Sequence, residues 1–165
     1  MFDSMSVSSA RRRTVGASVS LGLAIGAIGL FLASSVLADG AMVTRGEFHP
    51  FAAGVGLDLG GHAQMIRTAD GKTIVSVHVE GLSANTTYGS HVHQQACADG
   101  AADGHYRFDP SGPATPPNEI WPGFTTNDAG IGNGNATVDR TAGPTAVSVV
   151  VHAPGGAKIA CADLR

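Results

Sequence analysis

Hydrophobic and polar residues alternate with a period of two in several short stretches of this chain. The clearest example is a pair of stretches, residues 62–68 and 72–79, joined through the dipeptide Asp70-Gly71. In the second stretch, valine or threonine at every odd position is followed by isoleucine, serine or histidine. Successive side chains of a strand point to opposite faces, and Asp-Gly favours a tight turn, so this pattern predicts a β-hairpin with one buried face.

Shorter stretches of the same kind predict further strands. They cover residues 86–93, 136–140, 146–153 and 157–162, while residues 39–50 are either a linker or a first strand. Several short strands separated by turns are typical of a β-sandwich or β-barrel.

Residues 94–123 interrupt this rhythm. They lack hydrophobic periodicity and are rich in proline. A loop of that length inside a compact domain is usually functional, so we expect part of a functional site there.

The composition agrees with an all-β domain. The 165 residues are enough for one domain with a short appendage, 23 of them are glycine, and only 14% are charged. The formal net charge of −3 provides no basic surface for nucleic acid or for an anionic membrane. We therefore expect no nucleic-acid partner and a membrane contact only through the N-terminal segment.

The first 38 residues have the pattern of an export signal. Arg11 to Arg13 precede an uncharged apolar stretch, residues 14–38, which predicts a hydrophobic helix. It exceeds the about 7 to 15 apolar residues of a usual signal peptide and reaches the roughly 20 that cross a bilayer. A cleaved signal and an uncleaved anchor both stay open, and either places the rest of the chain outside the cytoplasm, secreted or anchored to the cytoplasmic membrane. The expected organisation is residues 1–38 as signal or anchor, 39–56 as linker or first strand, and 57–165 as the functional domain.

The chain has two cysteines, Cys97 and Cys161, and both lie in the exported part. An oxidising compartment lets thiols pair, so one disulfide is the simple interpretation, with two free buried thiols as the alternative.

Four of the seven histidines are candidate metal ligands. His91 and His93 are two residues apart on a predicted strand and therefore share one face. His152 ends a run of valines on another predicted strand, and His105 lies in the long loop. Neutral imidazoles suit copper or zinc, and an all-nitrogen set without thiolates favours Cu(II). Histidines that merely lie on the surface are the alternative, since an isolated His-x-His pattern is a weak signal.

The residues around these histidines resemble the copper/zinc superoxide dismutase family. Residues 81–97, which include Gly81-Leu82 and the run from Tyr88 to Cys97, are similar to its copper-binding strand. Gly104-His105 with Asp109-Pro110 is similar to the loop of its bridging histidine, and residues 149–161 are similar to its C-terminal strands. The resemblance extends over residues 57–164, and the order and spacing of the histidines and both cysteines agree with it.

This resemblance implies a Greek-key β-barrel or sandwich. It further implies one copper ion held by His91, His93, His105 and His152, and a disulfide between Cys97 and Cys161. The implied activity is superoxide dismutation, in which copper alternates between Cu(II) and Cu(I) while superoxide is converted to oxygen and hydrogen peroxide. Superoxide would be the small-molecule substrate, and a copper-loading protein is a possible partner.

The zinc site of the family is missing from the sequence. No histidine occurs between His105 and His152, and Asp109 and Glu119 are the only carboxylates of residues 106–123. These are too few for a closed four-ligand zinc site, so we expect no zinc. The pattern resembles the copper-only branch of the family, in which a glutamate supports the bridging histidine. Glu119 is the candidate for that role with His105, with a plain solvated loop residue as the alternative.

Lys158 stands three residues before Cys161, where members of the family usually carry an arginine that guides the anionic substrate. Lysine keeps the charge but not the forked geometry, and an ordinary lysine at a strand end is the alternative. The connection from His152 to Cys161 is short, which predicts an open site. Trp121 is interpreted as a packing residue that covers the former zinc region.

Three functional hypotheses follow from these residues. The leading one is a copper-dependent superoxide dismutase without zinc. The second is an exported copper-binding or copper-storage module with little or no catalysis, and the third is an interaction domain whose histidines no longer bind metal. His49, His62 and His78 lie outside the matched motifs and receive no role.

Overall fold

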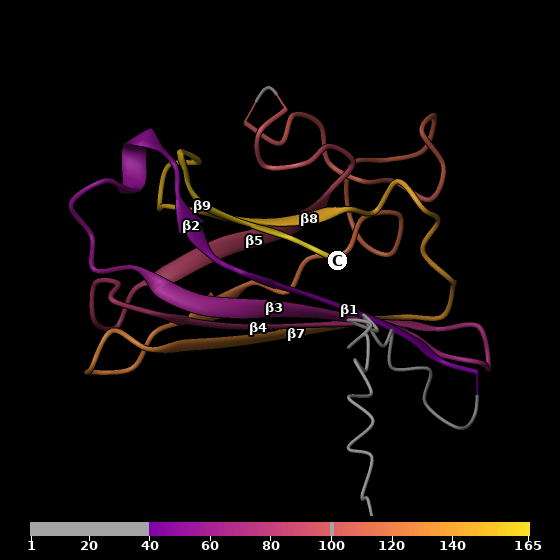
Figure 1. The fold of residues 1–165 in the computed structure, drawn as a ribbon, viewed down its shortest axis with the longest axis horizontal. Coiled ribbons are helices and arrows are strands. Elements are labelled where there is room, and N and C mark those ends of the chain that lie inside the picture. Colours follow the sequence, from indigo (N-terminus) through magenta and orange to yellow (C-terminus); the bar gives the residue numbers. More distant parts are fainter. Residues whose placement is uncertain (1–39, 100) are drawn as a thin grey trace, which may run out of the picture. The chain divides into compact units, whose positions relative to one another are not determined.

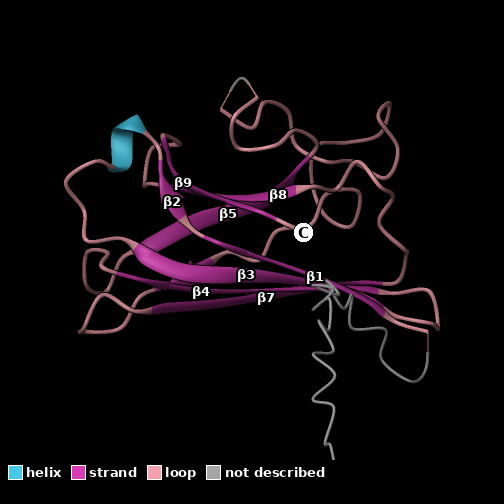
Figure 2. Ribbon diagram, viewed as in Figure 1, coloured by secondary structure: helices cyan, strands magenta, loops and turns pink. Residues whose placement is uncertain are grey.

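The computed structural model describes residues 40–99 and 101–165, and this part of the chain is almost entirely β-structure (Figure 2). Its one short helix is a 3-10 turn, η1, at Ala52–Gly54. The signal or anchor helix predicted for residues 1–38 lies outside the described residues. Among those that are described, no helix is long and apolar enough to cross a membrane.

The described residues form nine strands in two antiparallel sheets, which lie as two layers in Figure 1. The first sheet has four strands in the order β1-β3-β4-β7, with the bounds Met42–Glu47, Gly60–Arg67, Thr73–Glu80 and Gly132–Val138. The second has five strands in the order β2-β9-β8-β5-β6, with the bounds His49–Pro50, Lys158–Asp163, Ser148–His152, Thr87–His93 and Phe124–Thr125.

The predicted hairpin is confirmed as β3 and β4. Arg67 pairs with Thr73 across the turn, and the register continues to Gly60 opposite Glu80. Odd-numbered residues of β4 are buried, and even-numbered residues up to His78 are partly exposed. The buried side chains enter a core between the two sheets, which also receives Met65, Val92 and Val149.

The strand predicted at residues 136–140 starts four residues earlier, because β7 is Gly132–Val138. Its first half is rich in glycine and asparagine, so it carries no hydrophobic alternation. Gly132 and Gly134 are nevertheless buried, and a Cβ at these positions would collide with the Phe124 ring and with the Pro122 carbonyl oxygen. Close approach of neighbouring backbone and aromatic groups, not side-chain hydrophobicity, therefore defines this part of the strand.

The all-β expectation is confirmed, and of the two expected architectures, barrel or sandwich, the described residues form two antiparallel sheets that do not close into a barrel. The five-stranded sheet ends in two strands of only two residues each, β2 and β6. So few backbone groups cannot continue the pairing around a closed cylinder. Besides the shared core, two backbone hydrogen bonds of 2.9 and 3.0 Å join Arg45 on β1 to Arg165, which lies two residues after the end of β9.

A disulfide joins Cys97 to Cys161, which confirms the predicted pair and closes a loop of 64 residues. It fastens the start of the long loop to β9. As expected, the described part of residues 94–123 contains none of these strands. His105 forms only a single antiparallel β-bridge, with His93. Figure 1 shows part of this loop, in salmon, on the side of the five-stranded sheet that faces away from the four-stranded sheet, whereas its residues Tyr106 and Ile120 are buried in the core.

Candidate metal centre

Three segments of the chain bring four histidines together. His91 and His93 lie on the outer face of β5, because the alternate residues Tyr88, Ser90 and Val92 face the core. The neighbouring strand β8 places His152 directly opposite Gly89 on β5.

The long loop supplies the fourth histidine. Backbone hydrogen bonds from Tyr106 to Val92 (2.8 Å) and from Gln94 to Gly104 (3.1 Å) hold His105 beside β5. These two bonds fix the loop on both sides of the imidazole, so His105 is positioned by the strand that carries His91 and His93.

The four imidazoles converge on one point. Each offers a ring nitrogen, and these nitrogens all lie within 4.8 Å of one another. Ring centroids are 4.3 Å apart for His91 and His105 and 4.8 Å apart for His93 and His105. Bonds from imidazole nitrogen to zinc, a typical divalent ion, are about 2.0 to 2.1 Å long, so a single ion is of the right size for this cluster.

Several ring nitrogens in the cluster are buried without a hydrogen-bond partner. They are Nδ1 of His91, Nε2 of His93 and Nε2 of His152. A buried polar atom left without a partner costs about 1 to 3 kcal/mol, and native proteins keep few of them. Three such atoms aimed at one point fit a bound metal ion, which would satisfy all of them at once.

The opposite nitrogens of two rings are held by backbone carbonyls. His93 Nδ1 donates to Ala102 O (2.6 Å), and His152 Nδ1 donates to Gly156 O (3.0 Å). A carbonyl only accepts hydrogen bonds, so the proton of each ring is on Nδ1 and Nε2 keeps its lone pair. The fold thus selects the tautomer that a metal requires.

Burial keeps these imidazoles neutral. It lowers the pKa of His91 to about 3, an effect to which the neighbouring His105, His152 and His93 add. Burial also lowers the pKa of His93 to about 3, outweighing the raising effect of the Ala102 carbonyl, and lowers the pKa of His152. Neutral imidazoles are the form that binds metals.

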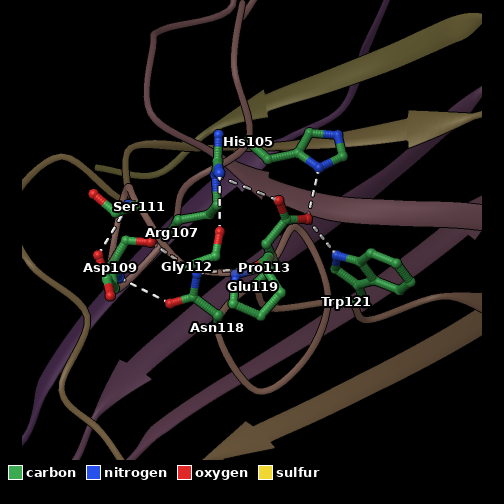
Figure 3. Close-up of polar contacts among 9 residues, drawn as sticks. All are labelled: His105, Arg107, Asp109, Ser111, Gly112, Pro113, Asn118, Glu119 and Trp121. Carbon is green, nitrogen blue, oxygen red and sulfur yellow. Dashed lines mark hydrogen bonds and ion pairs between the residues drawn. The ribbon is translucent and has the colours of Figure 1, made fainter.

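Glu119 is the carboxylate partner of His105. His105 Nδ1 donates to Glu119 Oε2 at 2.7 Å, and the Glu119 side chain is only 1% exposed. Trp121 Nε1 donates to the same oxygen at 2.7 Å, and Arg107 Nε lies 3.8 Å from the other oxygen. Figure 3 shows His105 and Trp121 converging on this carboxylate. The buried charge is therefore compensated by two hydrogen-bond donors and one cation.

The segment that carries Glu119 is pinned by Asn118. The Asn118 side chain donates to the carbonyls of Asp109 (2.8 Å) and Pro113 (3.0 Å) and accepts from the Asp109 backbone N–H (2.8 Å). A proline-rich segment without regular structure thereby holds the carboxylate in place (Figure 3).

Trp121 covers one side of the cluster. Its ring stands edge-on to His91 with 5.0 Å between centroids, and the residue is 39% exposed. Sequence reasoning identified Trp121 only as a packing residue, and it missed Arg107 altogether. Trp121 lies two residues after Glu119, and Arg107 lies two residues after His105. Residues two apart in an extended chain point to the same side, so this spacing could have identified both as neighbours of the site.

Lys158 lies near the cluster at the start of β9. Its ammonium donates to Ala101 O (2.9 Å) and Ala102 O (3.1 Å), and the second of these carbonyls also accepts from His93. Ala101 and Ala102 both have a positive φ, at 56° and 51°, a conformation that is uncommon outside glycine. Two strained residues thus turn successive carbonyls toward one ammonium group, which places a positive charge beside His93.

The other three histidines lie elsewhere: His49 is on β2, His62 on β3 and His78 on β4. One further described group of possible ligands contains Cys97, Cys161 and Asp163, but its two sulfur atoms are joined in the disulfide.

Comparison of the chain with models of known protein families gives no match, and no curated protein is significantly similar to it. A functional proposal therefore depends on the residues and geometry of the four-histidine cluster.

Proposed function

We propose that this protein is a copper-dependent superoxide dismutase without zinc, similar to the copper-only branch of the copper/zinc superoxide dismutases. The observation that carries the proposal is the convergence of four imidazole nitrogens within 4.8 Å of one another. The same four histidines, in the same order along the chain, are the copper ligands that the sequence resemblance implies.

The donor set favours copper. Four neutral nitrogen donors without thiolate or carboxylate suit Cu(II). Copper bound there would supply one-electron chemistry, cycling between Cu(II) and Cu(I), so that two superoxide ions and two protons give one oxygen and one hydrogen peroxide. A buried cluster of uncharged ligands leaves a net positive charge on the centre, which attracts an anion.

The residues around the cluster have distinct tasks in this proposal. Glu119 fixes the ring orientation of His105 and holds the proton on its Nδ1, so that Nε2 can bind the metal. Lys158 places a positive charge beside His93, where it raises the local concentration of superoxide. Trp121 restricts the orientation of Glu119 and covers one side of His91.

We further propose that the protein acts outside the cytoplasm. The disulfide is consistent with an oxidising compartment. Residues 1–38 carry the pattern of an export signal or membrane anchor, and its arginines lie before the apolar stretch, as expected for a cytoplasmic N-terminus.

The test combines metal analysis with a superoxide assay on the purified protein. We expect one copper per four-histidine cluster and rapid removal of superoxide without zinc. His93→Gln should abolish this activity, and the matched variant His49→Gln, at an exposed histidine outside the cluster, should retain it. Circular dichroism and disulfide content would confirm that both variants fold. Copper binding without turnover would support the copper-storage alternative, and failure to bind copper would exclude both functions.

A further inference from the structure

Trp121 contacts the four-histidine cluster and its carboxylate partner at the same time. Its ring stands edge-on to His91 with 5.0 Å between the ring centroids, which is an ordinary contact for aromatic rings. Its Nε1–H donates to Glu119 Oε2 at 2.7 Å, and Figure 3 shows the indole N–H turned toward this carboxylate. Trp121 is the only tryptophan of the chain. A single indole therefore links one histidine of the cluster with a buried proton acceptor.

The other two easily oxidised aromatic rings of the chain lie in the core. Among aromatic side chains, indole and phenol lose an electron most readily, and the chain contains two phenols, Tyr88 and Tyr106. Both are buried between the two sheets. In the described structure their ring contacts are with Phe124 and Phe108, respectively, and not with a histidine of the cluster. Of these three oxidisable rings, Trp121 is therefore the one in contact with the cluster.

The hydrogen bond to Glu119 provides an acceptor for the indole proton. Removal of one electron from a neutral indole leaves a cation whose N–H proton is far more acidic than that of the neutral ring. Glu119 Oε2 is already aligned with this proton at 2.7 Å. The electron can therefore leave Trp121 on the side of His91 while the proton leaves on the side of Glu119, so the oxidised ring keeps no net charge.

Trp121 is also open to solvent, unlike the residues that it contacts most closely or lies beside. It is 39% exposed, whereas Glu119 and His93 are each 1% exposed. A small reductant in the medium can therefore reach the indole without entering the four-histidine cluster. The exposed face of Trp121 thus connects the buried centre with electron donors outside the protein.

We propose that Trp121 is a redox-active residue, which takes up the oxidising equivalent that arises when hydrogen peroxide meets reduced copper in the cluster. This inference rests on the proposed function, which supplies both the Cu(I) and the hydrogen peroxide. Reducing one hydrogen peroxide to two water molecules takes two electrons and two protons. Reduced copper supplies one electron, Trp121 supplies the other through its contact with His91, and solvent supplies the protons. The Nε1 proton of Trp121 passes to Glu119 Oε2, which leaves a neutral tryptophan radical, Cu(II) and two water molecules.

Oxidation of Trp121 protects the histidines of the cluster. The other targets of the same oxidising equivalent are the imidazoles that would hold the copper, and an imidazole that gains oxygen loses the neutral ring that binds metal. The indole radical, in contrast, is reversible. A reductant of the medium returns one electron to Trp121, and Glu119 returns the proton along the same hydrogen bond. Each such cycle removes one hydrogen peroxide and leaves the copper ligands intact.

The test exposes the purified full chain, loaded with one equivalent of copper and reduced, to hydrogen peroxide. Electron paramagnetic resonance of rapidly frozen samples detects the radical, and peptide mass spectrometry then locates the oxygen atoms that were added. We expect the spectrum of a neutral tryptophan radical and, without a reductant, oxygen added to the peptide that contains Trp121. The metal-free and the zinc-loaded protein should show neither, because zinc fills the cluster without any redox chemistry.

Three variants separate oxidation of Trp121 from a purely structural role. In Trp121→Phe we expect loss of the tryptophan radical, a shift of the added oxygen to the peptide that contains His91 and His93, and faster loss of copper. Trp121→Tyr restores an oxidisable ring, so it should give a tyrosine radical and less histidine oxidation than Trp121→Phe. Tyr106→Phe removes a phenol of the core and should keep the wild-type radical.

The outcomes separate this inference from the proposed function. Equal histidine oxidation in the wild type and in Trp121→Phe would overturn it, as would loss of the radical in Tyr106→Phe alone. Copper uptake and superoxide removal without oxidation of Trp121 would also overturn it, but would leave the dismutase standing. Oxidation of Trp121 in a protein that binds copper without removing superoxide would support the inference and overturn the dismutase. A protein that takes up no copper would overturn both.

Discussion

Replacing Glu119 with glutamine removes the negative charge from the side chain that accepts a hydrogen bond from His105. The shape of the side chain at position 119 stays almost unchanged. Both donors, His105 Nδ1–H and Trp121 Nε1–H, bond to the same oxygen of Glu119, Oε2. The carbonyl oxygen of a glutamine has two lone pairs and can accept from both. The amide group would then take the place of Oε1 and turn an N–H donor toward Arg107, where a carboxylate oxygen now lies 3.8 Å from the guanidinium.

The variant therefore replaces two charge-assisted hydrogen bonds with neutral ones. It also turns the new amide N–H group toward the guanidinium of Arg107, which is itself a donor. Neutral hydrogen bonds are about half as strong as charge-assisted ones. Partners of metal-bound histidines typically contribute about 10- to 100-fold to metal affinity, which corresponds to about 1.4 to 2.8 kcal/mol. We expect Glu119→Gln to weaken copper binding by that factor. Glu119→Ala should weaken it further because His105 then has no partner.

The assay is copper competition against a chelator of known affinity, with Asp109→Asn as the matched control. Asp109 is the other carboxylate of the same loop segment, and its side chain accepts from the Ser111 backbone N–H (2.9 Å) instead of from a histidine. Wild-type affinity in Glu119→Gln, or an equal loss in Asp109→Asn, would refute the role of Glu119 as the partner of His105.

Three further outcomes follow from the site. Trp121→Phe keeps an aromatic ring but deletes the N–H donor to the buried carboxylate, so the free energy of unfolding, followed by circular dichroism in urea, should fall by about 1 to 2 kcal/mol; an unchanged value would contradict this contact. Lys158→Gln should lower the rate of superoxide removal by about tenfold or less and flatten its dependence on ionic strength, and identical salt profiles would argue against anion guidance. In the metal-free protein, burial lowers the pKa of His91 and His93 on β5 to about 3, against 6.5 for an ordinary histidine. As the pH falls, the unfolded chain therefore takes up protons before the folded chain does. The free energy of unfolding that burial of these histidines preserves is fully present above pH 6.5, and it should decline toward pH 5 by up to about 1.4 kcal/mol per pH unit for each histidine. Free energies from urea titrations that stay constant over this pH range would disprove the burial of these groups.

Local patterns were sufficient to predict the hairpin and half of the four-histidine cluster. Asp70-Gly71 and the alternation along β4 are consequences of strand geometry that the sequence displays directly. The placement of His91 and His93 on one face has the same origin. Such features depend only on residues that are close in the chain.

Features that depend on distant contacts could not be derived in this way. The start of β7 is defined by glycines that fit against Phe124 and Pro122, a constraint that exists only after the sheets have packed. Similarly, the position of His105 depends on backbone bonds to β5. Without the family resemblance, nothing in the local sequence would have brought His105 and His152 together with the other two histidines.

The partners of Glu119 illustrate the same limit. Its buried position and its contacts with Trp121 and Arg107 result from a proline-rich segment with no periodic pattern, pinned by the side chain of one asparagine. Sequence reasoning could nominate Glu119 as the available carboxylate, but the neighbours that compensate its charge are defined by the fold.

The most direct test of the central claim is X-ray absorption spectroscopy at the copper edge on the protein loaded with one equivalent of copper. We expect three or four imidazole nitrogens at about 2.0 Å from the metal, the length usual for imidazole ligands of divalent metals, and no sulfur scatterer, with the loss of one imidazole in His93→Gln. A first shell of oxygen with one imidazole or none, or a spectrum unchanged by His93→Gln, would contradict a copper centre formed by these four histidines.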